Sequence, residues 1–579
     1  MEHGQFWRNK ELREHISVID EKLSPTIILK NGVYLNVFTK MWLEANIWIY
    51  HDRIIYVGEK LPENLTNVEV VDCTGQYLVP GYVETHAHPF QLHNPEELGH
   101  HAGKYGTTTL INDNLGIFNL KNKKKALSLI DAFHELPISM FWWGRYDSQT
   151  ALRQEELIYT TADLFKWLEH PAVVQGGELT AWPELLAGDD RLLYWIQKTN
   201  QLKKPVEGHL AGASKEVLTK LKLFGVSSDH EALTGQEVLD RLEQGYHVAL
   251  RYSSLRSDLP DILTDLEHLG LNHFDDLSFT TDASSPKFIE KGLINLCIDI
   301  AIMQGVPLVE AYRMGSYNAA KHIKLDDVVG SIAPGKIANI NILYDKSDPN
   351  PLSVIAKGEW LVKEGYVMPY QQHINWSEYK TENIKYDWDL SEDDLQFSIP
   401  IGLKVESDII MKPYAVGADI TTDILPDKTP DAFLLLIDQY GKWRVNSVIN
   451  GFTDSLGGLA SSYSTTGDVI FIGKNKDDIL IAAKRLKEIG GGIVLVDQGE
   501  IIYELKLALN GTMFIGGMET LINKEKEFNR ILNKYGYPFE NPLFNLLYLS
   551  ATSIPYLRIT QQGLYDVVKR ETIVPANMR

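Results

Sequence analysis

The chain has 579 residues, of which 44% are hydrophobic and 23% charged, and its formal net charge is −21. A chain of this length divides into several domains, and its composition is that of an ordinary globular protein. The acidic excess argues against a nucleic acid partner, because phosphate backbones are bound through clustered lysines and arginines.

The two cysteines, Cys73 and Cys297, exclude both a disulfide framework and a cysteine-rich metal site. The first ten residues lack the apolar core of a signal peptide, and no stretch approaches the roughly twenty apolar residues of a membrane span. We therefore expect no membrane partner and a cytoplasmic location. The oligomeric state stays open, with a homo-oligomer such as a dimer as one alternative.

The N-terminal segment predicts a helix followed by a small β domain. Residues 5–22 are polar and amphipathic, and short β segments with the turns Lys-Asn-Gly and His-Asp fill residues 26–79. We assign residues 1–80 to a small β-sandwich-like domain with an N-terminal helix.

From Gly81 onward, short apolar strand candidates alternate with helical stretches. The candidates are Tyr82–His88, Thr107–Asp113, Ile138–Trp143, Ala172–Glu178, Pro205–His209, Val226–His230, His247–Tyr252 and Leu277–Asp282. Eight strands separated by helices in about 200 residues are typical of a (β/α)8 barrel. We therefore predict an α/β protein with a TIM-like barrel over residues 81–330, and a doubly wound open sheet is the structural alternative.

The β pattern returns after the predicted barrel. Residues 331–370 contain strand-like segments that we expect to rejoin the N-terminal β domain, which is then discontinuous in the chain. Residues 380–579 alternate strands and helices, and we assign them to a separate C-terminal α/β domain.

His86 and His88 are the most informative residues of the sequence. They end the first predicted barrel strand in Val-Pro-Gly-Tyr-Val-Glu-Thr-His-Ala-His-Pro (79–89). Residues i and i+2 of a strand point to the same side, so the two imidazoles project together. Two imidazoles on one side form half of a typical metal site.

Other strand ends carry further ligand-type residues, at the edge where barrel active sites lie. They are Glu178, His209, His230 and Asp282, with Glu231 directly after His230. Mixed imidazole and carboxylate ligands suit Zn, Fe, Mn or Co. Six ligands exceed the needs of one four-coordinate ion, so we expect two divalent ions and choose Glu178 as the bridge. Taken singly, Glu178 is more commonly a surface carboxylate at the start of a helix, and Asp282 could be a helix N-cap.

Three more histidines follow the first strand, on a polar and predicted helical segment. They are His93, His100 and His101. We expect these three to be solvated at the surface.

Together these motifs resemble the adenine deaminase family of the amidohydrolase superfamily, of which the chain looks like a divergent member. The resemblance spans nearly the whole chain and includes Pro80–His88, Tyr105–Thr109, Asp229–Glu231, Gly330–Gly335 and Ile489–Gly492. It implies that His86, His88 and Asp282 hold one metal ion, that His209 and His230 hold the other, and that Glu178 bridges them.

The resemblance also implies a reaction and two catalytic carboxyl groups. Water attacks C6 of adenine or of an N6-substituted adenine and gives hypoxanthine with ammonia or an alkylamine. Asp282 would accept the proton of the water and pass it to the leaving amine, and Glu231 would protonate a ring nitrogen or orient His230. The partner is then a small purine base, and the ions are Mn, Fe or Zn.

The sequence departs from the family around the expected pocket. Pro89-Phe90-Gln91 replaces the usual Glu-Ser-Ser, Ala283-Ser284-Ser285 follows Asp282, and residues 460–468 lack both histidines of the family's C-terminal loop. A 6-methyladenine preference, an N-acetyl-sugar deacetylase and a non-catalytic scaffold therefore stay open as alternatives.

Overall fold

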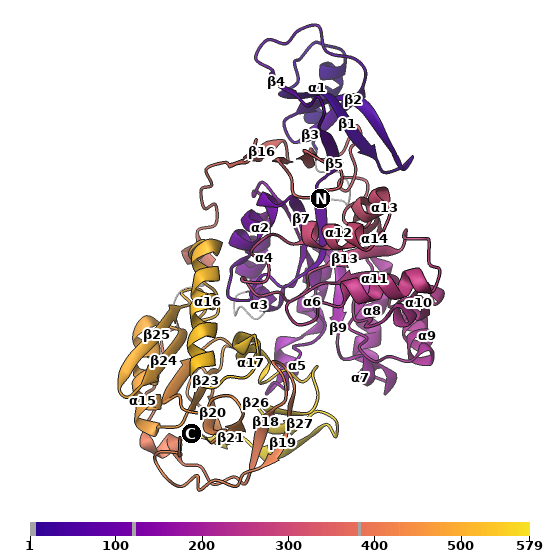
Figure 1. Ribbon diagram of the computed structural model, residues 1–579. Helices are drawn as coiled ribbons and strands as arrows, with labels where there is room; N and C mark the ends of the chain where they lie inside the picture. Colours follow the sequence, from indigo (N-terminus) through magenta and orange to yellow (C-terminus); the bar gives the residue numbers. More distant parts are fainter. Residues whose placement is uncertain (1–6, 119–122, 380–383, 428) are drawn as a thin grey trace.

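The computed structural model describes residues 7–118, 123–379, 384–427 and 429–579. Figure 1 shows the barrel in the middle of the molecule, between the small β sheet at the top of the view and the C-terminal part below. The first helix, α1 (Asn9–Ile19), lies inside the predicted range 5–22. Residues 5 and 6 of that range fall outside the described residues.

The predicted barrel is confirmed. Its eight strands, all within the described residues, form one parallel sheet in sequence order. They are β6 (Tyr82–Ala87), β7 (Thr107–Asn112), β8 (Ser139–Gly144), β9 (Val173–Leu179), β10 (Val206–Gly208), β11 (Ser228–Asp229), β12 (His247–Arg251) and β13 (Leu277–Thr280). Every residue of these strands is buried, as expected of parallel strands covered on both faces.

The first and last barrel strands meet through side chains that bond to the facing backbone. Thr85 Oγ1 donates to the carbonyl of Phe279 at 3.2 Å, and Thr280 Oγ1 donates to the carbonyl of His86 at 3.1 Å. All eight strands therefore point their C-terminal ends to one rim, where barrel active sites lie.

Helices surround the barrel. The longer ones are α2 (Pro95–Lys104), α4 (Lys123–Phe133), α6 (Thr161–Glu169), α8 (Asp190–Gln201), α9 (Lys215–Phe224), α10 (Gly235–Glu243), α11 (Leu259–His268) and α12 (Ile294–Met303). Shorter ones are α3 (Leu115–Phe118), α5 (Glu155–Ile158), α7 (Trp182–Leu186), α13 (Leu308–Met314) and α14 (Tyr317–His322). Several of them begin at a side-chain cap: Asn94 accepts from the backbone of Glu97, and Ser214 and Thr234 act likewise.

The expectation for the three histidines near α2 was wrong. His93 and His101 are buried, and His100 is half-buried against the ring of Tyr370 at 3.9 Å. His101 Nε2 bonds the carbonyl of Ile289 at 2.7 Å, which satisfies the ring nitrogen in the interior. The polar sequence of α2 gave no sign that the segment around Tyr370 and the C-terminal part would cover this helix.

The small β sheet combines two distant parts of the chain. Its strands are β1 (Ile27–Asn36), β2 (Met41–Tyr50), β3 (Arg53–Gly58), β4 (Glu69–Asp72), β5 (Tyr77–Pro80), β14 (Ile340–Leu343), β15 (Ser353–Ala356), β16 (Glu359–Lys363) and β17 (Tyr366–Val367). The two parts join where β5 pairs with β14 in antiparallel register. Our division of the chain into numbered domains stays an interpretation.

The C-terminal part contains a mixed sheet, a three-stranded sheet and helices. The mixed sheet comprises β18 (Ile401–Val405), β19 (Met411–Ala415), β20 (Asp431–Ile437), β21 (Trp443–Asn450), β22 (Gly458–Ser461), β23 (Val469–Gly473), β24 (Gly492–Asp497), β25 (Glu500–Lys506) and β29 (Asn577–Met578). The smaller sheet comprises β26 (Leu557–Thr560), β27 (Gly563–Asp566) and β28 (Glu571–Pro575). The helices are η1 (Trp376–Tyr379), η2 (Glu392–Leu395), α15 (Lys476–Ile489), α16 (Met518–Lys534) and α17 (Pro542–Tyr548).

Two further observations bear on the sequence analysis. None of the helices in the described ranges is both long and apolar enough to cross a membrane. Cys73 and Cys297 are both buried free thiols.

Candidate metal centre

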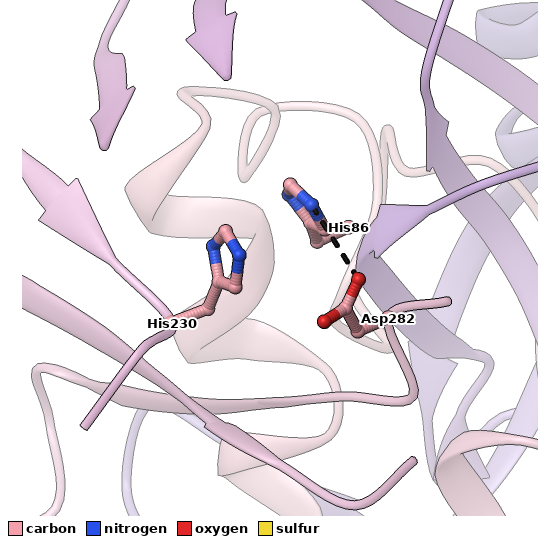
Figure 2. A group of neighbouring side chains, drawn as sticks. All are labelled: His86, His230 and Asp282. Carbon is pink, nitrogen blue, oxygen red and sulfur yellow. Dashed lines mark ion pairs between the residues drawn. The ribbon is translucent and has the colours of Figure 1, made fainter. Parts of the chain in front are cut away.

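All six predicted ligand side chains meet at the C-terminal rim of the barrel. Their candidate ligand atoms form three overlapping groups, each within 4.8 Å. The groups are His86, His230 and Asp282; His86, His88 and Glu178; and Glu178, His209 and His230. Figure 2 shows the first group, in which side chains from β6 and from the segments after β11 and β13 point toward one another. Their role as ligands stays a prediction.

The first half of the centre is built on β6. His86 Nε2 and His88 Nε2 face each other at 3.2 Å. Asp282 Oδ1 lies 3.1 Å from His88 Nε2 and 3.9 Å from His86 Nε2. The ring of Trp143 stacks on His86 with a centroid distance of 4.4 Å and fixes the plane of the imidazole. Two imidazoles and a carboxylate thus converge on one point.

The second half involves Glu178, His209 and His230. Glu178 Oε1 lies 2.7 Å from His209 Nδ1 and 3.6 Å from His230 Nε2, and its Oε2 lies 3.9 Å from His86 Nε2. The two oxygens of Glu178 therefore face different halves of the centre. This is the position that a bridging carboxylate needs.

Outer carboxylates orient the imidazoles. Asp113 Oδ2 lies 3.0 Å from His88 Nδ1, and Glu207 Oε1 lies 3.0 Å from His230 Nδ1 and 3.3 Å from His86 Nδ1. When Nδ1 carries the proton and donates it to a carboxylate, Nε2 presents a lone pair. The Nε2 atoms of all three histidines therefore face the centre as potential ligands.

The arrangement fits a divalent metal. Among the described residues, His209 Nδ1 and His230 Nε2 are buried without a hydrogen-bond partner, although both face carboxylates. Unpartnered buried nitrogens beside carboxylate oxygens are costly, and a cation between them would satisfy both. The mixed nitrogen and oxygen donors suit a divalent transition metal.

The charge balance points the same way. Five buried carboxylates contact the ligands or belong to them, whereas three arginines contact those carboxylates. The carboxylates are Asp113, Glu178, Glu207, Glu231 and Asp282, and the arginines are Arg145, Arg251 and Arg256. With neutral imidazoles this set keeps an excess of two negative charges, which bound cations would neutralise.

Burial and neighbouring charges set the protonation of the centre. Burial favours a raised pKa for Glu178, but its close contact with His209 and the other nearby imidazoles outweigh burial and hold the pKa well below the usual range. For Asp282, Arg251 and His88 likewise outweigh burial and lower the pKa. Both carboxyl groups are therefore ionised and able to bind a cation.

The two predicted catalytic carboxyl groups share one arginine. Arg251 Nη1 lies 2.5 Å from Glu231 Oε1 and 2.5 Å from Asp282 Oδ2. Arg256 Nη2 lies 3.0 Å from the other oxygen of Glu231. Glu231 Oε1 also lies 3.5 Å from both His209 Nδ1 and His230 Nε2. Glu231 thus lies at the edge of the centre and is held by the guanidinium groups of Arg251 and Arg256.

Sequence reasoning missed several residues of the centre. Asp113 and Arg251 each end a barrel strand or its predicted range, so the strand-end rule contained the signal for both. Glu207 precedes His209 by two residues on β10 and could have been found by the same argument. Arg145 directly follows β8 and contacts Glu178 and Asp113 at 3.3 Å, so the strand-end rule contained its signal as well.

Comparison with known proteins defines the class of the protein. Residues 77–361 match the amidohydrolase family, and residues 412–571 match the adenine deaminase C-terminal domain. Together with the barrel and its rim of histidines and carboxylates, these matches make the chain a hydrolase of C–N bonds of the amidohydrolase type.

Relatives define the family more narrowly. "Putative adenine deaminase OB0751" of Oceanobacillus iheyensis is 57% identical over the full length of both chains. "Putative adenine deaminase YerA" of Bacillus subtilis is 44% identical over 99% of each chain. "Adenine deaminase" of Bacillus subtilis is 24% identical over 96% of this chain and 98% of that one. The chain belongs to the adenine deaminase family.

Proposed function

We propose that the protein is a metal-dependent hydrolase that removes the 6-amino group of adenine or of an N6-substituted adenine. The observation that carries this proposal is the convergence of six ligand-type side chains at the barrel rim. Family membership over the full length of the chain supports the purine substrate. The products are hypoxanthine and ammonia or an alkylamine, and one water is consumed.

Two divalent ions, of Mn, Fe or Zn, fit the centre best. His86, His88 and Asp282 would hold one ion, His209 and His230 the other, and Glu178 would bind both. A divalent metal supplies a nucleophile at neutral pH, since it lowers the pKa of water from 15.7 to about 7.

Asp282 is the proposed proton carrier. Its Oδ1 faces the histidines of β6, whereas its Oδ2 contacts Arg251. A carboxylate in this position can accept the proton of the attacking water and transfer it to the departing amine, which cannot leave as an amide anion. Arg251 holds the carboxylate in the orientation for this transfer.

Glu231 is the proposed donor to the ring. Attack at C6 places negative charge on an adjacent ring nitrogen, which must be protonated as C6 becomes tetrahedral. Glu231 lies beside His209 and His230 and is fixed by Arg251 and Arg256. These contacts equally suit an orienting role for His230, and the Glu231→Gln variant separates the two through its metal content.

The experiment is a turnover screen over 6-substituted purines. The purified protein is stripped and then reconstituted separately with Mn, Fe and Zn, and hypoxanthine formation is followed by chromatography. The proposal expects turnover of at least one 6-aminopurine or 6-alkylaminopurine that depends on added metal. If no purine on the panel is turned over with any of the three metals, the proposal of a purine substrate is wrong.

A preference for 6-methyladenine or another 6-alkylaminopurine is the second candidate. The cavity beside His88 has apolar walls that include Phe90, Leu115 and Leu547, which suit an alkyl group. The ratio of kcat/KM for 6-methyladenine and adenine decides between the candidates.

The remaining expectations belong to the same proposal. A sugar deacetylase of the phosphosugar type would need a cluster of cations to bind the phosphate. Arg145, Arg251 and Arg256 all contact carboxylates, and the described residues of the cavity lining add a single lysine, Lys123. A non-catalytic scaffold would not need all six ligand-type residues, and all six are present at the rim. We keep a free purine base as the partner, a cytoplasmic location consistent with two free thiols, and no nucleic acid or membrane partner. A homo-oligomer such as a dimer stays one alternative.

A further inference from the structure

A cavity of about 680 Å³ opens beside the metal centre, and both the barrel and the C-terminal part line it. His88, Gln91 and Gln149 line it from the barrel. Thr465 and Tyr548 line it from the C-terminal part, and Tyr548 is the last residue of α17. A purine that reaches the centre from this cavity therefore contacts both parts of the chain.

The C-terminal part also fixes the barrel segment that carries Gln91. The backbone N–H of Phe514 donates to the carbonyl of Leu92 at 2.5 Å, and the side chain of Asn94 donates to the carbonyl of Phe514 at 2.9 Å. Leu92 and Met513 form an isolated parallel bridge. Gln91 is thus held between the barrel rim and the C-terminal part.

Gln149, another residue of the cavity lining, is also fixed by the C-terminal part. The backbone N–H of Thr552 donates to the carbonyl of Gln149 at 2.8 Å, and Thr150 Oγ1 donates to the carbonyl of Ser550 at 2.6 Å. Gln149 Nε2 donates to Glu178 Oε2 at 2.9 Å, so this amide already orients a predicted metal ligand. Gln91 differs from it, because Gln91 contacts no ligand in the hydrogen bonds described.

Gln91 has an unused acceptor in the cavity wall. Its side chain is 7% exposed, and its Oε1 has no hydrogen-bond partner among the described residues. Its Nε2 makes a long contact of 3.5 Å with Tyr548 Oη. A buried amide oxygen without a donor is unfavourable, and such atoms in native structures are commonly explained by a ligand or water.

We propose that Gln91 recognises the purine, its carboxamide oxygen accepting a hydrogen bond from the ring N–H of the imidazole half of the base. Tyr548 is a positioning residue that holds the carboxamide from the C-terminal part. A free base carries this N–H at N7 or N9, whereas a base substituted at N9 does not. The pair therefore selects free bases over 9-substituted purines. This inference rests on the proposed function.

The test compares the variants Gln91→Met and Tyr548→Phe with the wild-type protein. Methionine keeps the length of the side chain but removes the acceptor, and phenylalanine removes only the hydroxyl. Gln236→Met and Tyr194→Phe are matched controls, since both residues are exposed on outer helices. The assays are kcat and KM for adenine and 9-methyladenine, calorimetric binding of hypoxanthine and 9-methylhypoxanthine, and metal content.

In Gln91→Met we expect the KM for adenine and the Kd for hypoxanthine to rise about tenfold, the effect of losing one buried hydrogen bond. The preference for the free base over the 9-methyl base should fall by a similar factor, with metal content unchanged. Tyr548→Phe should lower the same preference by a smaller factor, which a merely structural role would not do.

An unchanged preference in Gln91→Met, in an otherwise active enzyme, would overturn the assignment of Gln91 and leave the proposed function standing. An unchanged preference in Tyr548→Phe would overturn the positioning role. If the metal-loaded wild type turns over no 6-aminopurine and binds no hypoxanthine, the proposed function fails and the role of Gln91 fails with it.

Discussion

Glu207 offers the sharpest test of how the outer carboxylates support the centre. Its Oε1 contacts His230 Nδ1 at 3.0 Å and His86 Nδ1 at 3.3 Å, so one carboxylate orients a histidine from each half. Burial favours a raised pKa for Glu207, but the imidazoles outweigh it and hold the pKa below its usual range, so the group is ionised. The Glu207→Gln variant removes the charge and keeps the shape.

The size of the effect follows from those two contacts. A hydrogen bond with an ionised partner is worth about 1.5–3 kcal/mol, roughly twice a neutral one. Replacing the carboxylate by an amide should therefore cost about 1–1.5 kcal/mol at His230, whose Nδ1 is hydrogen-bonded to Glu207, or close to tenfold in affinity for the ion at His209 and His230. The longer contact with His86 Nδ1 is not a hydrogen bond, so the loss for the other ion should be smaller. The new amide would also face the Nε2 donor of Gln175, which now contacts Glu207 Oε2 at 2.5 Å. This agrees with the 10–100-fold losses typical of such outer partners.

The assay is competition with a chelating indicator, which gives the affinity of both sites, together with kcat/KM on the best purine. Glu216→Gln is the matched control, because the Glu216 side chain is 77% exposed on α9 and should leave both quantities unchanged. If Glu207→Gln binds both ions within twofold of the wild type, the reasoning about outer carboxylates is wrong.

Three further predictions concern catalysis, the contact between α16 and the barrel, and the metal. Glu525 of α16 makes this contact, since the backbone N–H of Lys287 donates to its Oε2 at 2.6 Å. Asp282→Asn should lower kcat at least about 10²-fold, which is the low end for general acid–base catalysis, and elemental analysis should still find metal. Near wild-type turnover in this variant would eliminate the proton-carrier role. Burial raises the pKa of Glu525 from 4.5 to about 7, so its contribution to stability is full below pH 4.5 and is lost as pH rises through 7. The drop in thermal midpoint between pH 5 and pH 8 should accordingly be smaller in Glu525→Gln, and an identical drop would refute this. Chelation of the metal should abolish turnover and lower the thermal midpoint, since an ion at 100 times its Kd stabilises the fold by about 2.7 kcal/mol. An unchanged thermal midpoint would count against metal binding in the folded state.

The barrel was predictable because its signal is local. Each strand is a short buried run, and the alternation with helices repeats eight times, so the count of strands and the ligand-type residues at their ends favoured a barrel over a doubly wound open sheet. His86 and His88 were predictable for the same reason, since their spacing places them on one side of β6 wherever the strand lies.

The rest of the site depends on contacts between distant segments. The strand ends place Arg145 and Arg251 at the rim, but the carboxylates that they contact depend on the register of neighbouring strands, which the sequence does not reveal. Gln91 and Tyr548 are 457 residues apart and meet only because the C-terminal part covers the rim. The burial of His93 and His101 was missed for the same reason, since composition does not show what will cover a helix.

Anomalous diffraction from a crystal of the reconstituted protein tests the central claim most directly. The account predicts two metal peaks at the barrel rim, one in contact with His86, His88 and Asp282, the other with His209 and His230, and both with Glu178. Peaks located elsewhere, or no peak at the rim after reconstitution with Mn, Fe and Zn, would contradict it.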